Sequence, residues 1–523
     1  MLAVAFGQPP KRAFRLGYTA GVAHYLASLY WLAYMPVAFV PILAWMALSA
    51  FLALYPATWV WLCRKLFPVL AGGHRVGDEE KNDEPSTLTG RIPATTWAQR
   101  VVWALTCAAV WVALELTVAH FLSGFPWNLL GASQFRLAPL IQISAFTGVY
   151  GVSFLVVWSS VSMLCAAMMI LRQPAMRSAW AGEIFLPLAV VGLVYGWGYL
   201  KLLRPPPVRP TVSVALVQPG VPQKMIWAES ENARRLEDLL ALSRQALASH
   251  PDVLIWPESG LPGMVRFQEE IAEPVAQLAQ SNMVWIIFAA DDATPKPGAA
   301  TLENADYYNA SFLMTPGGRL AAEYRKRQLV MFGEFVPLVR WLPFMKYLTP
   351  IPGGFTPGDR AVPFELTSLK LKVSVLICFE DVFPHLVREY VSEDTDFLVN
   401  LTNDGWFGEG PAQWQQAACA VFRAVENGVP LVRCSNTGVT GWVDEFGRVR
   451  QVFEDGPRGI YGPGFLLAKI PVLAPGEKRA PTYYHDHGDQ FAFVCAGISL
   501  LRFLRCWWGG RREKVGGAVA VSP

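Results

Sequence analysis

Two long stretches without aspartate, glutamate, lysine or arginine limit what this chain can fold into more than any other feature. They cover residues 16–63 and 137–171 of the 523-residue chain. A helix needs about 20 apolar residues to cross a bilayer core, where every backbone polar group must bond within its own segment. The first stretch is therefore long enough for two membrane spans, and the second for at least one.

The apolar segments of the whole chain predict six membrane spans. They lie near residues 16–34, 39–62, 101–121, 145–171, 184–200 and 489–508. The last is the weakest, because Arg502 and Arg505 follow a short uncharged run; a surface amphipathic helix is the alternative there. The first apolar region is far longer than that of a cleavable signal peptide.

Basic residues in short loops indicate the side of the membrane on which each loop lies. If six spans alternate, four basic groups fall on one side, which is then the cytoplasm. They are Lys11, Arg12 and Arg15; Arg64, Lys65, Arg75, Lys81, Arg91 and Arg100; Arg172 and Arg177; and Arg505, Arg511, Arg512 and Lys514. The 122–144 loop and residues 201–488 then face the other side. Residues 79–85 are polar or charged except for a final proline, and we expect them to form a solvated loop.

A soluble α/β domain is expected at residues 206–475, after a stiff proline spacer at 205–207. Apolar runs typical of strands covered on both faces alternate there with helical patterns. Strands are expected at 212–217, 253–256, 284–289, 373–378, 397–401 and 431–435, helices at 229–248, 268–280, 384–391 and 413–427, and hairpin turns near 316–318 and 444–447. Residues 1–205 then form a helical bundle with about five spans, and residues 476–523 hold the final span and a basic cytoplasmic tail.

Cys378 ends one of these apolar runs, at the strand end where α/β folds place reactive groups. A helix beginning beyond it would favour the thiolate. The alternative is a small buried hydrophobic residue, which is what most free cysteines are.

None of the eight cysteines has a CxxC partner or metal-ligand spacing, so no metal site is predicted. The net charge of +3 and the absence of a basic run with interleaved aromatics indicate no nucleic-acid partner.

Glu258 and Lys326 are the other candidates for chemistry. Glu258 also follows an apolar strand, and a partly buried carboxylate there can act as a general base. Its alternative is a helix cap or a loop carboxylate. Lys326 stands among three adjacent basic residues, which are normally solvated, but an apolar segment with Gly-Glu and a final proline follows it. A buried ammonium group near a thiol would stabilise a thiolate and an oxyanion.

In order and context, Glu258, Lys326 and Cys378 resemble the catalytic residues of the nitrilase (carbon–nitrogen hydrolase) superfamily. The closer resemblance is to a membrane-bound branch, the apolipoprotein N-acyltransferases. The shared sequences are Trp-Pro-Glu-Ser, Phe-Gly-Glu-Phe-Val-Pro, Ile-Cys-Phe-Glu, Thr-Asn-Asp-Gly-Trp-Phe-Gly and Arg-Ala-Val-Glu-Asn, with Phe125-Pro126-Trp127 in an outer loop. The resemblance runs over nearly the whole chain from about residue 16.

This resemblance implies a nitrilase-like αββα sandwich inserted into a transmembrane bundle, without a cofactor. It implies that Glu258 is the base, Lys326 the oxyanion stabiliser and Cys378 the thioester-forming nucleophile. An acyl chain would pass from a membrane phospholipid to the N-terminal amine of an S-diacylglyceryl-cysteine apolipoprotein. The protein would be multi-pass in the bacterial inner membrane, with its catalytic domain in the periplasm. Members of this branch usually have eight spans, so two are missing before residue 16; a start at an internal methionine and a naturally shorter membrane part are the two alternatives.

Further site residues follow from the same resemblance. Glu334 would orient the lysine or the base, and Glu380 matches the glutamate two residues after the cysteine. The residues implied at the substrate pocket are Trp227, Phe379, Asn403, Asp404 and Trp406. Simple packing is the alternative for Trp227, and turn formation is the alternative for the Asn-Asp-Gly segment. Phe379 stands where a tyrosine is usual, so only a hydroxyl group is lost.

Two other functions are compatible with parts of the sequence. A membrane-anchored amidase or nitrilase would use the same three residues with water in place of the amine, although it would not need so many spans. A transporter with an outer domain is the second alternative. The predicted spans hold few ionisable groups, whereas transporters usually place several there.

Overall fold

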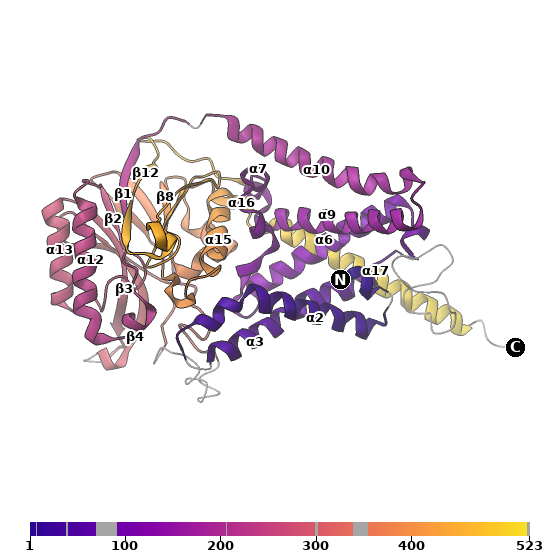
Figure 1. Cartoon of the computed structure of the whole chain (residues 1–523), viewed down its shortest axis with the longest axis horizontal. Helices are drawn as coiled ribbons and strands as arrows, with labels where there is room; N and C mark the ends of the chain where they lie inside the picture. Colours follow the sequence, from indigo (N-terminus) through magenta and orange to yellow (C-terminus); the bar gives the residue numbers. More distant parts are fainter. Residues whose placement is uncertain are drawn as a thin grey trace. The chain divides into compact units, whose positions relative to one another are not determined.

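The computed structural model describes residues 1–6, 8–37, 40–68, 91–205, 207–298, 302–337 and 354–519 (Figure 1). The polar loop predicted at residues 79–85 lies outside them. Contacts divide the chain into two compact units. The helical unit holds residues 1–30, 43–203 and 489–523, and the sandwich unit holds residues 31–42 and 204–488.

The helical unit is built around five helices that are long and apolar enough to cross a membrane, counted over the described residues. These are Val40–Lys65, comprising α3 (Val40–Leu52) and α4 (Leu54–Lys65); Trp97–Ser123, containing α6 (Trp97–His120); α9 (Val149–Arg172); α10 (Arg177–Leu203); and Gln490–Trp508 of α17 (Gln490–Val519). Helix α6 contacts α4, α9 and α17. Five of the six predicted spans coincide with these helices.

The span predicted at residues 16–34 is wrong in its bounds. Helix α2 (Pro10–Ser28) begins earlier and so includes three basic residues, Lys11, Arg12 and Arg15, and a 3-10 helix follows it at Tyr30–Tyr34. It is not among the five helices that meet the length and composition of a span.

Helix α2 packs closely on α4 instead. A Cβ atom added at Gly17 would lie 2.9 Å from the Cα of Ala57, and one at Gly21 would lie 2.7 Å from Pro56. Glycines four residues apart let two helix backbones approach this closely.

Two six-stranded sheets form the centre of the sandwich unit. The first has the order β12-β1-β2-β3-β4-β5, with β1 (Thr211–Gln218), β2 (Val253–Ile255), β3 (Trp285–Pro295), β4 (Ala305–Met314), β5 (Leu320–Arg325) and β12 (Gly464–Pro471). The second has the order β11-β10-β9-β8-β7-β6, with β6 (Pro363–Leu366), β7 (Leu371–Ile377), β8 (Phe397–Thr402), β9 (Leu431–Ser435), β10 (Gly441–Val443) and β11 (Val449–Val452). Strands β1 to β3 are parallel to one another, as are β7 to β9.

Helices cover the outer face of each sheet, which confirms the predicted α/β sandwich. Figure 1 shows α12 (Asn232–Leu247) and α13 (Glu269–Asn282) side by side against the first sheet, and α15 (Ala412–Asn427) beside the second. The short helix α14 (Pro384–Val387) and a 3-10 turn at Arg388–Tyr390 replace the single helix predicted at 384–391. Both predicted hairpins are present, as β4–β5 and β10–β11.

Buried polar groups hold the layers of the sandwich unit together. The Sγ of Cys434, on β9, lies 3.3 Å from the carbonyl oxygen of Val217 on β1. On α15, Arg423 and Glu426 form an ion pair at 2.7 Å with both side chains buried. A spacing of three residues on a helix is also typical of exposed ion pairs, but the burial of both side chains places this pair in the core.

Candidate active site

Cys378 lies at the carboxyl end of β7, where the chain turns sharply into a 3-10 helix (Cys378–Val382). Its φ is +52°, a left-handed conformation that a residue with a Cβ adopts only when its surroundings hold it there. The carbonyl oxygen of Cys378 accepts hydrogen bonds from Asn400 and Gln416, each at 3.0 Å. These buried amides fix the turn, and the cysteine itself is partly exposed.

The ammonium group of Lys326 lies between two carboxylates. Lys326 follows β5, and its Nζ is 2.9 Å from Oε1 of Glu334 and 3.6 Å from Oε1 of Glu258, which follows β2. Only 1% of Lys326 is exposed. Charges buried this deeply require partners, so the lysine and the two carboxylates form one electrostatic unit.

The thiol of Cys378 lies close enough to the Glu258 carboxylate for each group to change the pKa of the other. Glu258, Lys326, Glu334 and Cys378 therefore come together, although they lie up to 120 positions apart in the chain and follow strands of both sheets. Three of them lie at or just beyond the ends of β2, β5 and β7. The apolar runs before Glu258 and Cys378 predicted this for two of them, whereas β5 before Lys326 was not predicted as an apolar strand.

Asn309, on β4, was not predicted, yet it contacts both carboxylates. Its side-chain amide donates to Oε1 of Glu258 at 2.8 Å and to Oε1 of Glu334 at 2.9 Å. The second oxygen of each carboxylate accepts from a backbone N–H: Asn403 N for Glu258 at 3.0 Å, and Val330 N for Glu334 at 2.9 Å. The one sequence signal was an asparagine within an otherwise regular strand, where this residue is uncommon.

Protonation states follow from burial and from these neighbours. Burial raises the pKa of the Cys378 thiol well above its usual value; the charge of Glu258 raises it further, and Lys326 opposes both. The thiol is therefore protonated at neutral pH and needs a base. The sequence-based argument for a thiolate at a helix N-terminus is wrong, because a 3-10 turn of five residues follows the cysteine.

Glu258 is placed to be that base. Burial raises its pKa, and the positive charge of Lys326 opposes this rise. Burial alone would lower the pKa of Lys326, but Glu334, Glu258 and Cys378 together outweigh burial and raise it, so the lysine stays an ammonium ion. A base of raised pKa next to a permanent cation is suited to moving a proton from the thiol and stabilising an anion nearby.

Glu380 connects the segment that carries Cys378 with the segment that carries Lys326. Its carboxylate accepts from the backbone N–H of Ile377 at 2.8 Å, just before the cysteine. It also accepts from the N–H groups of Arg327 at 2.7 Å and Gln328 at 3.1 Å, just after the lysine, and from the hydroxyl of Tyr324. Glu380 thus holds the backbone beside Cys378 and the backbone beside Lys326 in fixed positions relative to each other.

A buried ionic network lies beside the cysteine turn. Arg433, on β9, lies 2.8 Å from Asp381 and 2.9 Å from Asp404, and only 3% of it is exposed. It also donates to Asn400, whose amide holds the carbonyl group of Cys378. Burial raises the pKa of Asp381 to about 7 even though Arg433 opposes the rise.

Replacing Arg433 with leucine should therefore destabilise the sandwich unit by about 3–5 kcal/mol, because two buried carboxylates lose their cation. The thermal unfolding midpoint of the full chain in detergent measures this. Arg450→Leu is the matched control: its partner is also an aspartate, Asp444, but 40% of the Arg450 side chain is exposed, so a loss of no more than about 1 kcal/mol is expected. Equal losses in the two variants would contradict the assignment.

The residues predicted at the substrate pocket fall into two groups. Asn403 and Asp404 are fully buried and hold other site residues: Asn403 contacts Glu258 and Gln223, and Asp404 contacts Arg433. Trp227 and Trp406 pack edge to face with ring centroids 5.3 Å apart, and 41% of Trp227 is exposed. Phe379 is buried and packs on Phe383. The two tryptophans are thus the members of this set with the most access to a ligand.

A two-sheet sandwich with glutamate, lysine and cysteine at its strand ends defines the carbon–nitrogen hydrolase class. Residues 213–462 match the Carbon-nitrogen hydrolase family. Among solved structures, a mutant amidase of the nitrilase superfamily from Nesterenkonia is 17% identical to this chain, covering 51% of this chain and 92% of its own, with a TM-score of 0.36.

The helical part identifies the branch. Residues 1–162 match the Apolipoprotein N-acyltransferase N-terminal domain. An apolipoprotein N-acyltransferase of Geobacter metallireducens is 33% identical over 505 residues, which is 95% of this chain and 87% of that protein. One from Bradyrhizobium diazoefficiens is 32% identical over 78% of this chain and 74% of its own. The chain belongs to the apolipoprotein N-acyltransferase family.

Proposed function

We propose that this protein transfers an acyl chain from a phospholipid, through a thioester on Cys378, to the N-terminal amine of S-diacylglyceryl-cysteine apolipoproteins. One observation carries the proposal: a protonated thiol, a base of raised pKa and a buried ammonium ion meet in one cluster. Family membership supports the nature of the acceptor, and the apolar helices support a location in the membrane.

In the first half-reaction Glu258 takes the thiol proton, and the sulfur attacks the ester carbonyl carbon of the phospholipid. The tetrahedral intermediate collapses as the carbon–oxygen bond breaks. Glu258 then gives its proton to the departing alkoxide, which leaves as a lysophospholipid. The Lys326 ammonium stabilises the oxyanion, and Glu334 and Asn309 keep that ammonium and the base in place.

In the second half-reaction the neutral amine of the acceptor attacks the thioester carbonyl. Glu258 accepts a proton from the attacking nitrogen, the carbon–sulfur bond breaks, and the sulfur regains the proton. The product is an amide, and the free thiol is restored. Two half-reactions that share one covalent intermediate predict ping-pong kinetics.

The orientation we propose is multi-pass in the bacterial inner membrane, with the sandwich unit in the periplasm. If each of the five helices crosses the membrane once, three groups of basic residues lie on the same side as the basic residues at the end of α17. They are Arg64 and Lys65 at the end of α4, Arg172 at the end of α9, and Arg177 at the start of α10. The group at Lys11, Arg12 and Arg15 does not add to this argument, because α2 does not have the composition of a span.

A radiolabelled phospholipid tests the proposal directly. The full chain should acquire a label that hydroxylamine releases, and peptide mapping should place it on Cys378; the buried Cys419 and Cys434 of the same unit serve as internal controls. Adding a diacylated lipopeptide should then transfer the label to its amine. A label on another residue would overturn the thioester. Release of free fatty acid at the same rate with and without lipopeptide would favour the amidase-like alternative, in which water is the acceptor.

A further inference from the structure

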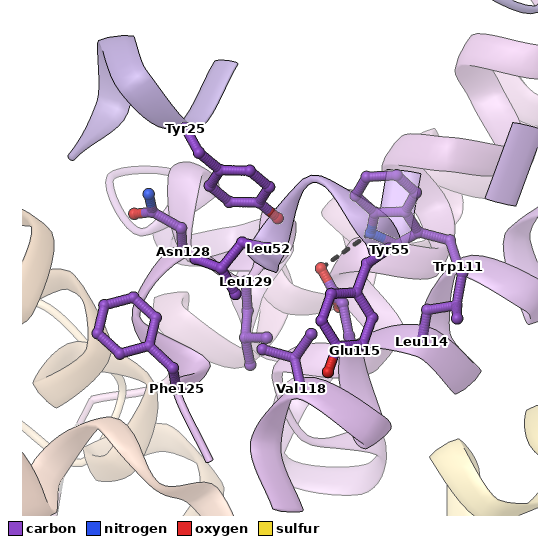
Figure 2. Close-up of a pocket in the computed structure, with 10 residues that line it drawn as sticks. All are labelled: Tyr25, Leu52, Tyr55, Trp111, Leu114, Glu115, Val118, Phe125, Asn128 and Leu129. Atoms are coloured by element: carbon purple, nitrogen blue, oxygen red, sulfur yellow. Dashed lines mark hydrogen bonds between the residues drawn. The ribbon is translucent and has the colours of Figure 1, made fainter. Parts of the chain in front are cut away.

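Carboxylates that serve the fold have donors or cations within the protein. Glu115 of the helical unit is one of them: it accepts a hydrogen bond from Trp111 Nε1 at 2.9 Å (Figure 2). Asp292, on β3, is another, and it forms an ion pair with Arg325 at 2.9 Å. Asp291, the residue before it, is different. Its side chain forms no hydrogen bond or ion pair with any residue that the structure describes.

Asp291 lies on the inner face of the first sheet, beside the active site. The antiparallel register of β3 and β4 places it directly opposite Asn309, so the two Cβ atoms lie about 4.5–5.5 Å apart on one face. The next pair in the register, Ala290 and Ala310, belongs to the apolar core under α12 and α13. Successive side chains of a strand point to opposite faces. Asp291 therefore shares a face with Asn309, whose amide holds both carboxylates of the active site.

Asp291 is the exposed member of this group of residues. Asn309, Glu258 and Glu334 are buried. Asp291 is exposed to solvent. The protein around it still excludes enough water to raise its pKa to about 6; the charges of Glu258 and Glu334 add to the rise, and Arg235 opposes it. Asp291 therefore lies where the catalytic cluster opens to solvent, and it is ionised at neutral pH.

The carboxylates of the cluster outnumber the cations that contact them. The ammonium group of Lys326 lies 3.6 Å from Glu258 and 2.9 Å from Glu334. Asp291 has no such partner, because Arg235, on α12, donates to an asparagine and to two backbone carbonyl groups instead. The ionised Asp291 is thus repelled by two neighbouring carboxylates without a cation in contact with it.

We propose that Asp291 binds the N-terminal ammonium group of the apolipoprotein acceptor at the mouth of the active site. An ionised carboxylate accepts charge-assisted hydrogen bonds from an ammonium group, and this ligand supplies the cation that Asp291 lacks. An N-terminal amine has an ordinary pKa of about 7.7–8.0, so the acceptor arrives largely as an ammonium ion at neutral pH.

The ammonium group must lose a proton before it can attack the thioester. One N–H bond breaks, the proton moves to the carboxylate of Asp291 and from there to water, and the nitrogen keeps the electron pair. That pair then forms the new bond to the thioester carbon. Contact with solvent, which the buried Glu258 lacks, suits Asp291 to release this proton.

Two substrates carry an ammonium group, and the choice of the acceptor rests on the proposed function. The other is a phospholipid with an ethanolamine headgroup. In that lipid the phosphate and the glycerol backbone separate the nitrogen from the ester carbon that reacts. The nitrogen of the acceptor, by contrast, must come into contact with the thioester carbon. Asp291 lies opposite the residue that holds the base, Asn309, and this position favours the nitrogen that reacts.

Binding is measured first, on the full-length Cys378→Ala protein in detergent, because it needs no turnover. Diacylated lipopeptides with a free or an acetylated N-terminus are titrated, and affinities come from the rise in unfolding midpoint. Adding Asp291→Asn should weaken binding of the free-amine lipopeptide by about 10-fold or more and change binding of the acetylated one far less. Asp306→Asn is the matched control, since it removes an aspartate of β4 whose ion pair with Lys296 is exposed. It should change neither affinity.

A second arm keeps Cys378 and follows transfer of a labelled acyl chain to the lipopeptide. Asp291→Asn should lower kcat/KM for the lipopeptide by about 10-fold or more, and Asp291→Glu should restore most of it because the charge returns. Acylation by a phospholipid with a glycerol headgroup, which has no ammonium group, should change far less. The unfolding midpoint of Asp291→Asn should equal or exceed that of the wild type, because the lost charge was repelled by its neighbours. Asp291→Ser takes its place, with the same expectation, should the asparagine variant not fold.

Unchanged binding and transfer in a folded Asp291→Asn protein would overturn the ammonium site. A loss confined to acylation by ethanolamine phospholipids would overturn the acceptor as its ligand. The proposed function can fail separately. If no adduct forms on Cys378 while Asp291→Asn still weakens only the free-amine lipopeptide, the ammonium site stands and the proposed function is refuted.

Discussion

Replacing Cys378 with alanine should abolish the acyl adduct and lower apolipoprotein acylation by roughly 10⁴-fold or more, as loss of a covalent nucleophile does in other enzymes. No other thiol of the sandwich unit can take its place. Cys419 and Cys434 are buried, and burial raises the pKa of Cys419 to about 12. Rates of adduct formation with labelled phospholipid and of transfer to a lipopeptide measure the loss.

Cys419→Ala is the matched control for that experiment. It removes a thiol from the same unit, on α15, without touching Glu258 or Lys326. Its activity should stay within a few-fold of the wild type, with a small loss of stability from the missing sulfur. Retention of the adduct in Cys378→Ala, or its loss in Cys419→Ala at an unchanged unfolding midpoint, would contradict the assignment of the nucleophile.

Replacing Glu258 with glutamine should lower the rate of acyl-enzyme formation by roughly 10²- to 10⁴-fold, the usual contribution of a positioned base. Glutamine keeps the shape and an oxygen for Asn309, but it cannot accept the thiol proton. The thiol has a pKa well above its ordinary value, so little thiolate forms without the base. Single-turnover acylation measures this step apart from transfer.

The pH profile separates this role from a structural one. Burial raises the pKa of Glu258 above the ordinary glutamate value of 4.5, and only the ionised form is a base. Wild-type acylation should therefore fall as the pH drops through that raised pKa, and this acidic limb should be missing from the residual activity of Glu258→Gln. Asn309→Leu removes a donor that lowers this pKa, so it should shift the limb to higher pH. An identical limb in the wild type and in Glu258→Gln would exclude Glu258 as the base.

Several strands of the sandwich were predictable because a strand that is buried on both faces consists of a continuous run of apolar residues. Strands β2 and β8 are buried along their whole lengths, and both were found within a residue or two. Strand β12 was missed, since its burial pattern is mixed and its pairing with β1 joins segments some 250 residues apart. No local pattern carries that information.

The sequence predicted that Cys378, Glu258 and Lys326 belong to one site, but it did not predict the residues that hold them in place. Cys378 and Glu258 follow apolar strands, whose ends can be located from the sequence, and Lys326 precedes an apolar segment that contains Gly-Glu. Asn309 and Arg433 act from within strands, and their roles depend on which residues face them across the fold. The thiolate argument failed for a related reason: the protonation state of Cys378 depends on burial and on Glu258, neither of which the segment around the cysteine reveals.

The left-handed backbone of Cys378 sets conformational stability and catalysis against each other at a single position. Glycine occupies a φ of +52° freely, whereas a residue with a Cβ gives up about 1–3 kcal/mol to remain there. Selection for folding alone would thus drive this position toward glycine, and a laboratory search for heat-resistant variants would reward the loss of the nucleophile. Any screen that ranks variants of this enzyme by stability must therefore score acylation at the same time.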